Sequence, residues 1–162
     1  MKKFGRTGAA AATIALIIMA ASCTQAPSNT TSTTGTATTG AASVENGRNI
    51  FLYATSSSGD PLYQSSGPGM MYYSCASCHG QNAHGGQIFL MMAVYDVPNI
   101  TWAALTGPDP DMDHPPYTVD TFKRAVTQGL DPGGNRLEYP MPVWVISDRD
   151  LNDVIAFLQS LT

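Results

Sequence analysis

Two cysteines and a histidine lie within five residues of one another, in the run Cys75-Ala-Ser-Cys78-His79. Two thiols separated by two residues, with an imidazole directly after the second, form the pattern through which haem c is attached to a chain. In a helical turn, this spacing brings both sulfurs to the two vinyl groups on one porphyrin edge, where two thioethers form. The adjacent histidine is then carried beneath the iron and binds it through Nε2. The pattern therefore predicts one covalent haem c, held by Cys75, Cys78 and His79.

Two cysteines at this spacing also have three other known roles in proteins. A thioredoxin-like redox pair would lie in a βαβ context, and no such context surrounds residues 75–79. A zinc site would need two more ligands at suitable spacing. A plain structural disulfide is compatible with an oxidising compartment. Haem attachment agrees best with the complete pentapeptide, with the export signal described below and with short helices that need a central group.

A haem that carries electrons needs a second axial ligand on its iron, and histidine and methionine are the candidates. His84 is too close to His79 in sequence to reach the opposite haem face. His114 lies among prolines in a loop, where a solvated histidine is expected.

Among the methionines, Met91 and Met92 are expected to line the haem pocket, since methionine fills irregular apolar gaps. Met141 differs because Pro140 and Pro142 flank it and favour an extended chain. It also comes just before the last predicted helix. Met141 is therefore the leading candidate for the sixth iron ligand.

Residues 1–22 have the features of an export signal. Three basic residues precede an apolar run over residues 9–21, which is short for a membrane span and fits a secretory signal. Small residues then precede a single cysteine, Cys23, and this resembles the lipobox of bacterial lipoproteins, although position 20 holds Ala where Leu is more usual. The resemblance implies cleavage before Cys23 and attachment of a diacylglycerol to its thiol. An ordinary secretory signal or an uncleaved anchor is the alternative.

The rest of the chain divides into a linker and a domain. Residues 24–43 are mostly Thr, Ser, Ala and Gly and carry no charge, which is typical of a flexible linker. We therefore expect a signal over residues 1–22, a lipidated cysteine and linker over residues 23–43, and a domain over residues 44–162. The protein is expected to be exported and lipid-anchored at the periplasmic or outer face of a bacterial membrane.

The charge of the chain excludes some partners. Three of the eight basic residues precede Cys23, so the mature chain has five basic and twelve acidic residues, a formal charge of −7. This balance argues against nucleic acid and against charge-driven adhesion to anionic lipid. Acidic residues are concentrated between Asp109 and Asp120. A redox partner of this protein is therefore expected to present a basic or neutral docking surface.

The domain is predicted to be mainly α with much loop. Helices are expected over residues 44–54, after a weak cap at Ser43, and over residues 118–128, ended by Gly129. A short helix should begin within residues 98–102, and the run from Ser147 to Asp150 is a capping-box pattern for the last helix. The apolar side of that helix is formed by Leu151, Val154, Ile155, Leu158 and Leu161. Residues 55–69 and 106–117 are expected to be loops, and no alternating run is long enough to predict a sheet.

With these residues in place, the chain resembles small monohaem class I cytochromes c. The matching positions are Cys75, Cys78, His79 and Gly80, then Gly129 and Gly133-Gly134, then Met141-Pro142 with Trp144 close behind, and finally the capped last helix. The resemblance covers about residues 44–162. It departs from the family between the first helix and the cysteines, where 23 residues separate Phe51 from Cys75 and only a few are usual.

The resemblance implies a small helical fold wrapped around one covalently bound haem, with Met141 as the sixth iron ligand. It also implies that the first and last helices cross, with Gly47 and Phe51 against Val154 and Phe157. The expected function is single-electron transfer by a carrier that is not itself an enzyme. The alternative is a haem-based sensor or small-ligand binder whose sixth ligand is displaced.

Overall fold

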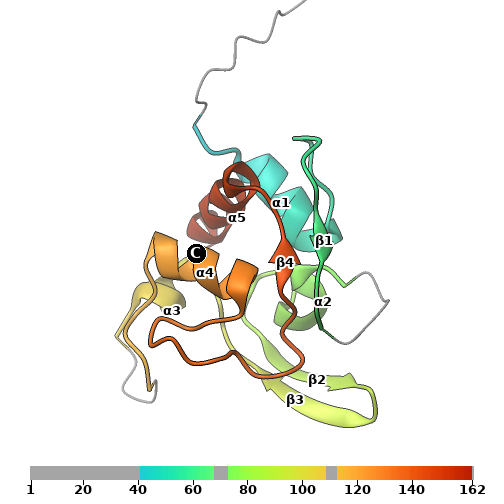
Figure 1. Ribbon diagram of the computed structural model, residues 1–162, viewed down its shortest axis with the longest axis vertical. Helices are drawn as coiled ribbons and strands as arrows, with labels where there is room; N and C mark the ends of the chain where they lie inside the picture. Colours follow the sequence, from blue (N-terminus) through green and yellow to red (C-terminus); the bar gives the residue numbers. More distant parts are fainter. Residues whose placement is uncertain (1–40, 68–72, 109–112, 162) are drawn as a thin grey trace, which may run out of the picture. The chain divides into compact units, whose positions relative to one another are not determined.

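The computed structural model describes residues 41–67, 73–108 and 113–161. The predicted signal, Cys23 and the linker up to residue 40 lie outside the described residues, as do Asp109 and Asp111. In chain order, the elements are α1 (Val44–Tyr53), β1 (Tyr63–Gln64), α2 (Cys75–His79), β2 (Gly86–Leu90), β3 (Ala93–Val97), α3 (Trp102–Thr106), α4 (Val119–Gln128), β4 (Trp144–Val145) and α5 (Asp148–Ser160) (Figure 1). The fold is mainly α, as predicted. None of the helices within the described ranges combines the length and hydropathy that a membrane crossing requires.

The predicted helix ends are confirmed because each depends on chemistry within a few residues. Ser43, Thr101, Thr118 and Ser147 each accept a backbone N–H of the first turn of α1, α3, α4 and α5, respectively. Gly129 ends α4 in the left-handed region, with φ of 68°.

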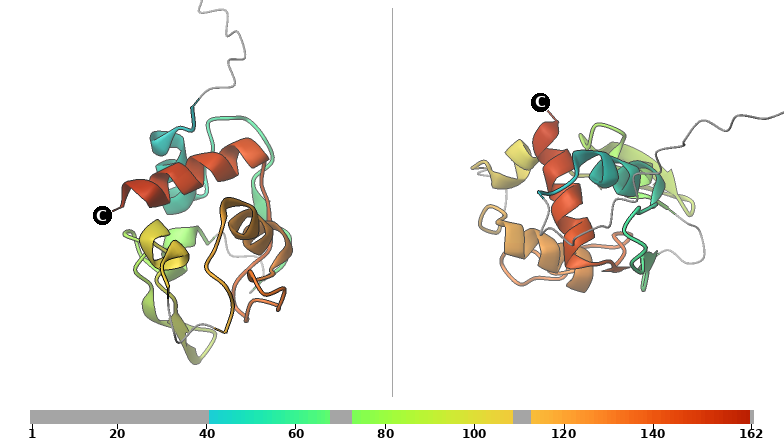
Figure 2. Two further views of the ribbon diagram at one scale, coloured as in Figure 1. Left: turned by 90° about the vertical axis from the view of Figure 1, so that its left-hand side faces the viewer. Right: turned by 90° about the horizontal axis from the view of Figure 1, so that it is seen from above.

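The first and last helices cross at a glycine, as the resemblance implied. A Cβ placed on Gly47 would lie 1.9 Å from the backbone oxygen of Asp153 and 2.9 Å from the backbone nitrogen of Val154. Only a residue without a side chain therefore allows this approach of α1 to α5 (Figure 2). Beside the crossing, the rings of Phe51 and Phe157 pack with centroids 5.3 Å apart.

The predicted capping box of α5 is only half formed. Ser147 Oγ accepts the N–H of Asp150 at 3.2 Å, as predicted. The carboxylate of Asp150, which is fully buried, instead accepts hydrogen bonds from Asn46 Nδ2 at 3.1 Å, Ser56 Oγ at 2.8 Å and Ser58 Oγ at 2.9 Å. A buried carboxylate needs several donors, and the tertiary structure supplies them from α1 and the segment after it.

A second buried carboxylate extends this network along the crossing. Asp153 accepts hydrogen bonds from Asn46 Nδ2 at 2.8 Å and from the N–H of Ser43 at 2.6 Å. The amide of Asn46 therefore bridges two carboxylates of α5, at 3.1 Å and 2.8 Å. The network fixes how α1 and α5 are placed along one another.

Two short sheets correct the expectation that the domain has none. β2 and β3 form an antiparallel hairpin, and β1, which lies in the predicted loop over residues 55–69, pairs with β4. The hairpin turn consists of Met91 and Met92, both with positive φ, at 50° and 69°. Tight hairpin turns of this kind normally use Asn-Gly or Asp-Gly, so the sequence lacks the usual signal. The strand sequences also lack a clear alternation of apolar and polar residues, because Phe89 and Val94 are apolar although they lie at exposed positions.

The core joins α1, α3, α4 and α5 and also includes Ala83, which follows α2. Its fully or nearly buried apolar residues are Ile50, Phe51, Ala83, Leu105, Phe122, Val154, Ile155, Phe157 and Leu158. On α4, Phe122 and Ala125 are buried, and Val126 packs at the edge of the core, as the sequence predicted.

Replacing Gly47 tests the helix crossing. We expect Gly47→Ala to lower the free energy of unfolding by about 2 kcal/mol or more, because the new methyl group would overlap the backbone of Asp153. Helix propensity acts in the opposite direction by about 1 kcal/mol, so this loss cannot arise from propensity. Chemical denaturation of the holoprotein gives the value. Arg48→Ala, at the exposed neighbouring position, is the matched control and should change stability by less than about 0.5 kcal/mol. A Gly47→Ala protein as stable as the parent would contradict the close approach.

Candidate haem site

The apolar faces of the helices meet around a cavity of about 570 Å³. Cofactor and ligand sites in proteins commonly have volumes of about 300–1,000 Å³. The apolar wall of the cavity in this protein is formed by Ile50, Phe51, Leu62, Ile100, Leu105, Phe122, Val126, Leu137, Trp144, Ile146, Leu151, Val154 and Leu158. Every helix contributes side chains, so the cavity takes the place that a continuous core would have.

The short helix α2 brings Cys75, Cys78 and His79 to the wall of this cavity. The N–H of Ser74 donates to Ser77 Oγ at 3.1 Å, which closes the first turn of the helix. Residues three apart in a helix share a face, so both thiols line the cavity from one side of α2. Both are free thiols in the structure.

The surroundings of the two thiols do not suit thiol–disulfide exchange. Burial raises the pKa of Cys75 to about 12 and also raises the pKa of Cys78. Redox-active Cys-x-x-Cys pairs instead have a cysteine with a lowered pKa, because the thiolate is the attacking species. This argues against the thioredoxin-like alternative.

His79 is oriented by a backbone group on a different segment. Its Nδ1 lies 3.2 Å from the carbonyl oxygen of Pro98, and because a carbonyl only accepts, Nδ1 carries the proton. Burial lowers the pKa of the imidazole, while the hydrogen bond to Pro98 acts in the opposite direction. The neutral ring therefore keeps the lone pair of Nε2 available for a metal.

Met141 lines the same cavity from the segment between α4 and α5. Its N–H donates to the carbonyl oxygen of Glu138 at 3.0 Å, and a proline stands on either side of it. The structure thus brings all four predicted haem-binding side chains to one cavity, from two segments far apart in the sequence.

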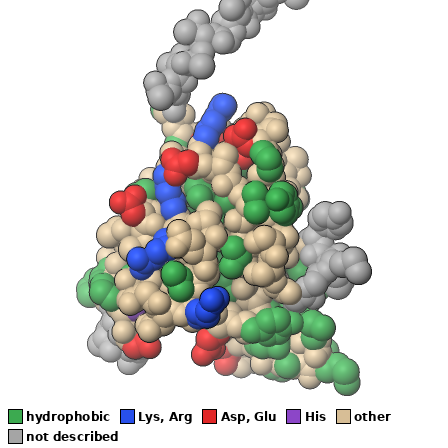
Figure 3. Space-filling model, viewed as in Figure 1, with side chains coloured by type: hydrophobic (Ala, Val, Ile, Leu, Met, Phe, Trp, Pro, Cys, Tyr) green, Lys and Arg blue, Asp and Glu red, His purple; other side chains and the backbone are tan. Residues whose placement is uncertain are grey.

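The prediction that Met91 and Met92 line the pocket is wrong. Both lie at the tip of the β2–β3 hairpin, where their exposed fractions are 66% and 91%. Neither is among the residues around the cavity. The apolar side chains at the lower end of the face in Figure 3 lie over this hairpin.

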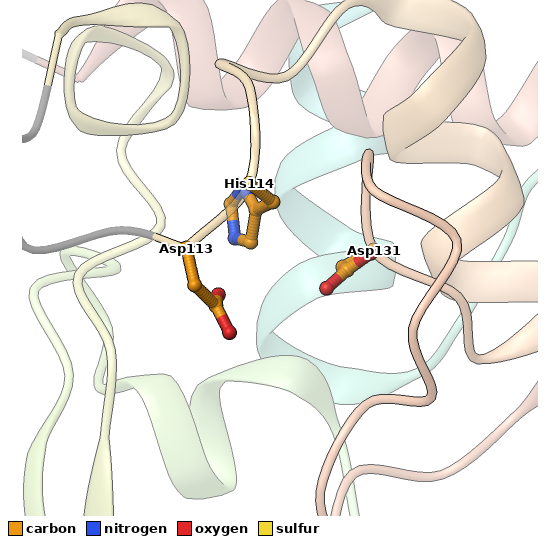
Figure 4. Close-up of side chains that lie close together, drawn as sticks. All are labelled: Asp113, His114 and Asp131. Atoms are coloured by element: carbon orange, nitrogen blue, oxygen red, sulfur yellow. The ribbon is translucent and has the colours of Figure 1, made fainter.

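The other two histidines lie away from the cavity lining. The ring of His84 pairs with Asn82, with 3.0 Å between Nδ1 and Nδ2, just after α2. His114 lies beside Asp113 and Asp131, with the nearest nitrogen and oxygen atoms of the three side chains within 4.8 Å of one another (Figure 4).

Asp131, the buried member of this group, has partners of its own. It accepts hydrogen bonds from the backbone N–H of Asn135 at 2.8 Å and from Asn135 Nδ2 at 3.0 Å. Burial opposes its ionisation, but these hydrogen bonds and the nearby His114 outweigh that effect and lower its pKa. We therefore assign Asp131 to shaping the turn after α4, as the acceptor that closes it.

Two sets of contacts near the site were not predicted. Pro98 acts through its backbone carbonyl, which no side-chain pattern could reveal. Tyr139 connects the hairpin to the Met141 segment: its hydroxyl donates to Met91 Sδ at 3.0 Å, and its ring lies 6.0 Å from that of Tyr95. The proximity of Tyr139 to Met141 in the sequence was the only available signal.

The chemistry of these donors fits a haem c group. Paired thiols suit thioether attachment, and a neutral imidazole and a methionine sulfur are both ligands of haem iron. The apolar wall suits the burial of a macrocycle, and the cavity lies between helices that do not otherwise fill it. A small helical domain with a Cys-x-x-Cys-His helix on such a cavity is a c-type cytochrome.

Comparison with known families agrees with this class. The family model described as Cytochrome c matches residues 62–162, which is more than half of the chain. The chain therefore belongs to the cytochrome c family. The search of curated proteins found no match to this sequence.

Family membership confirms the expected fold and the general function. It supports a covalently bound haem c and haem-based electron transfer, in a family whose members are generally electron carriers rather than enzymes. The mainly helical structure, with only two short sheets among the described residues, is consistent with that fold.

Proposed function

We propose that the protein is an exported, membrane-tethered carrier of single electrons, with one haem c attached at Cys75 and Cys78 and with His79 and Met141 as iron ligands. The observation that carries the proposal is that these four residues line the same apolar cavity. When bound, the haem supplies the redox couple, and methionine ligation raises its reduction potential relative to ligation by two histidines.

The protein residues hold and shield this couple. The carbonyl of Pro98 orients His79 for binding through Nε2. The apolar wall would keep water away from the bound group. Met141 is restrained by its flanking prolines and by its N–H bond to Glu138. A restrained sixth ligand favours electron transfer over the alternative function of binding a small molecule at an open site.

Carbon monoxide distinguishes the two functions. The spectrum of the reduced parent protein should not change under CO, because Met141 occupies the sixth position. Met141→Ala should bind CO, lose the far-red absorption band of methionine-ligated ferric haem and have a lower reduction potential. Met92→Ala is the matched control, since Met92 is 91% exposed on the hairpin, and it should behave as the parent.

The same experiment tests the attachment residues. Haem should stay on the chain of both methionine variants in a denaturing gel, whereas Cys75→Ala with Cys78→Ala should release it. CO binding by the parent protein would favour the sensor or ligand binder, and an unchanged spectrum in Met141→Ala would reject Met141 as the ligand.

The location follows from residues 1–23 of the sequence. The signal-like leader and the lipobox-like run before Cys23 support a diacylglycerol anchor at the periplasmic or outer face of a bacterial membrane. The composition of residues 24–43 predicts a flexible linker, which would let the domain move relative to that anchor.

Detergent-phase partition tests the anchor. The mature parent protein should enter the detergent phase, and mass spectrometry should show a lipid on an N-terminal cysteine. Cys23→Ala should be recovered without lipid. Ser22→Ala, which leaves a small residue before the cysteine, is the control and should partition as the parent does. A parent protein found wholly in the aqueous phase, with an unmodified N-terminus, would reject the lipid anchor.

Charge around the cavity indicates the kind of redox partner. Asp96 and Glu138 line the cavity, and no Lys or Arg within the described residues does so. Together with the charge of −7 expected for the mature chain, this favours a partner with a basic or neutral surface.

Small redox reagents of opposite charge test this electrostatic preference. Oxidation by a cationic cobalt(III) complex should slow as ionic strength rises from about 0.01 M to 0.1 M, because the Debye length falls from about 30 Å to 10 Å. Oxidation by ferricyanide should accelerate over the same range. Asp96→Asn should weaken both dependences more than Glu45→Gln, which removes an exposed charge on α1 away from the cavity. Rates that do not depend on salt would contradict an acidic docking region.

A further inference from the structure

The segment between α1 and α2 has structure that its sequence did not suggest. It lies within the 23 residues that separate Phe51 from Cys75, where the chain departs from the usual cytochrome c pattern, and the composition of residues 55–69 predicts a loop. We propose that residues 55–67, here called the bridging segment, position Met141 by holding the chain that follows it. The inference rests on the proposed role of Met141 as the sixth iron ligand.

The bridging segment pairs with the chain directly after Met141. Tyr63 and Gln64 form β1 and pair with Val145 and Trp144 of β4. Both strands lie in connections between helices, β1 between α1 and α2 and β4 between α4 and α5. The position of β4, and therefore the course of the chain leading to it, depends on the bridging segment.

The contacts continue to the second residue after Met141. The carbonyl oxygen of Val143 accepts from the N–H of Ser65 at 2.8 Å and from its hydroxyl at 3.1 Å. The N–H of Val143 donates to Ser66 Oγ at 3.3 Å. Both backbone polar groups of Val143 are therefore satisfied by the bridging segment.

The closest contact lies at the residue next to Met141. A Cβ placed on Gly67 would be 2.7 Å from the Cβ of Pro142 and 3.1 Å from its Cα. The backbone of the bridging segment thus lies directly against Pro142, and no larger residue fits there without displacing it. A shift of the Met141 backbone away from the cavity would require Pro142 and Val143 to leave these partners.

The bridging segment is itself anchored at both ends. At its start, Ser56 and Ser58 donate to Asp150 at 2.8 Å and 2.9 Å, and Ser57 donates to Asn46. Further along, Gln64 Nε2 donates to the carbonyl oxygen of Tyr73 at 2.8 Å, two residues before Cys75. The segment therefore connects the chain that carries Met141 to the helix crossing and to the start of α2.

This arrangement predicts what loosening the segment would do. Local opening becomes more frequent as the hydrogen bonds that resist it are removed, and each is worth about a tenfold change or less in such an equilibrium. A protein with a weakened bridging segment should therefore release Met141 more often, although Met141 and the cavity wall are unchanged.

A pair of glycine variants tests the positioning role. Gly67→Val would displace Pro142, whereas Gly59→Val lies in the same segment, also at positive φ (78° against 133°), with no atom within 4 Å of the new Cβ. The reduced Gly67→Val holoprotein should bind CO at least about tenfold more tightly than the Gly59→Val protein. Hydrogen exchange at the amide of Val143 should also accelerate by a similar factor in Gly67→Val alone. Thermal unfolding of both variants shows whether a general loss of stability accounts for the difference.

The outcomes separate this inference from the proposed ligand. If Met141→Ala gains CO binding while Gly67→Val and Gly59→Val bind it equally, the ligand assignment stands and the positioning role is overturned. If Met141→Ala gains none, both are overturned. Should Gly67→Val fail to fold, Ser65→Ala with Ser66→Ala removes two of the hydrogen bonds to Val143 without a clash. That protein should bind CO several times more tightly than the parent, and an unchanged affinity would overturn the role.

Discussion

The domain is organised around an apolar cavity in the place of a continuous core. α2 and α3 have five residues each, and helices of this length are not stable alone. Such short helices keep their positions only by packing against other parts of the protein or against a bound group. Here, residues of both helices line the cavity. A covalently attached macrocycle would meet this need, because its apolar faces can pack against the helices and it cannot dissociate. The haem that the family implies would therefore stabilise the fold as well as carry the electron.

The crossing of α1 and α5 gives the cavity its fixed frame. Gly47 lets the two backbones meet, and Phe51 packs on Phe157 beside them. The amide of Asn46 then bridges the carboxylates of Asp150 and Asp153. Such a buried network is costly if any member lacks a partner, so it favours one placement of the helices over others. The same carboxylate of Asp150 also anchors the serines of the bridging segment.

The two proposed iron ligands are held in different ways. His79 belongs to a helix and is oriented by the Pro98 carbonyl at the base of the hairpin. Met141 belongs to an irregular segment, contacted on one side by the bridging segment and linked to the hairpin by Tyr139. A histidine next to two attachment cysteines needs little further support. The segment that carries Met141 is not helical, and its neighbours in the structure are the β1–β4 pair and the tip of the β2–β3 hairpin.

The parts that could be predicted are those whose chemistry is local in sequence. The Cys75–His79 motif, the caps at Ser43, Thr118 and Ser147, and the end of α4 at Gly129 each depend on residues a few positions apart. Resemblance to a family supplied the Gly47 crossing. The hairpin turn at Met91 and Met92, the partners of Asp150, the Pro98 carbonyl behind His79 and the pairing of β1 with β4 were decided by tertiary structure. These interactions join residues far apart in the chain or act through the backbone, and the burial that makes them favourable exists only once the domain has folded.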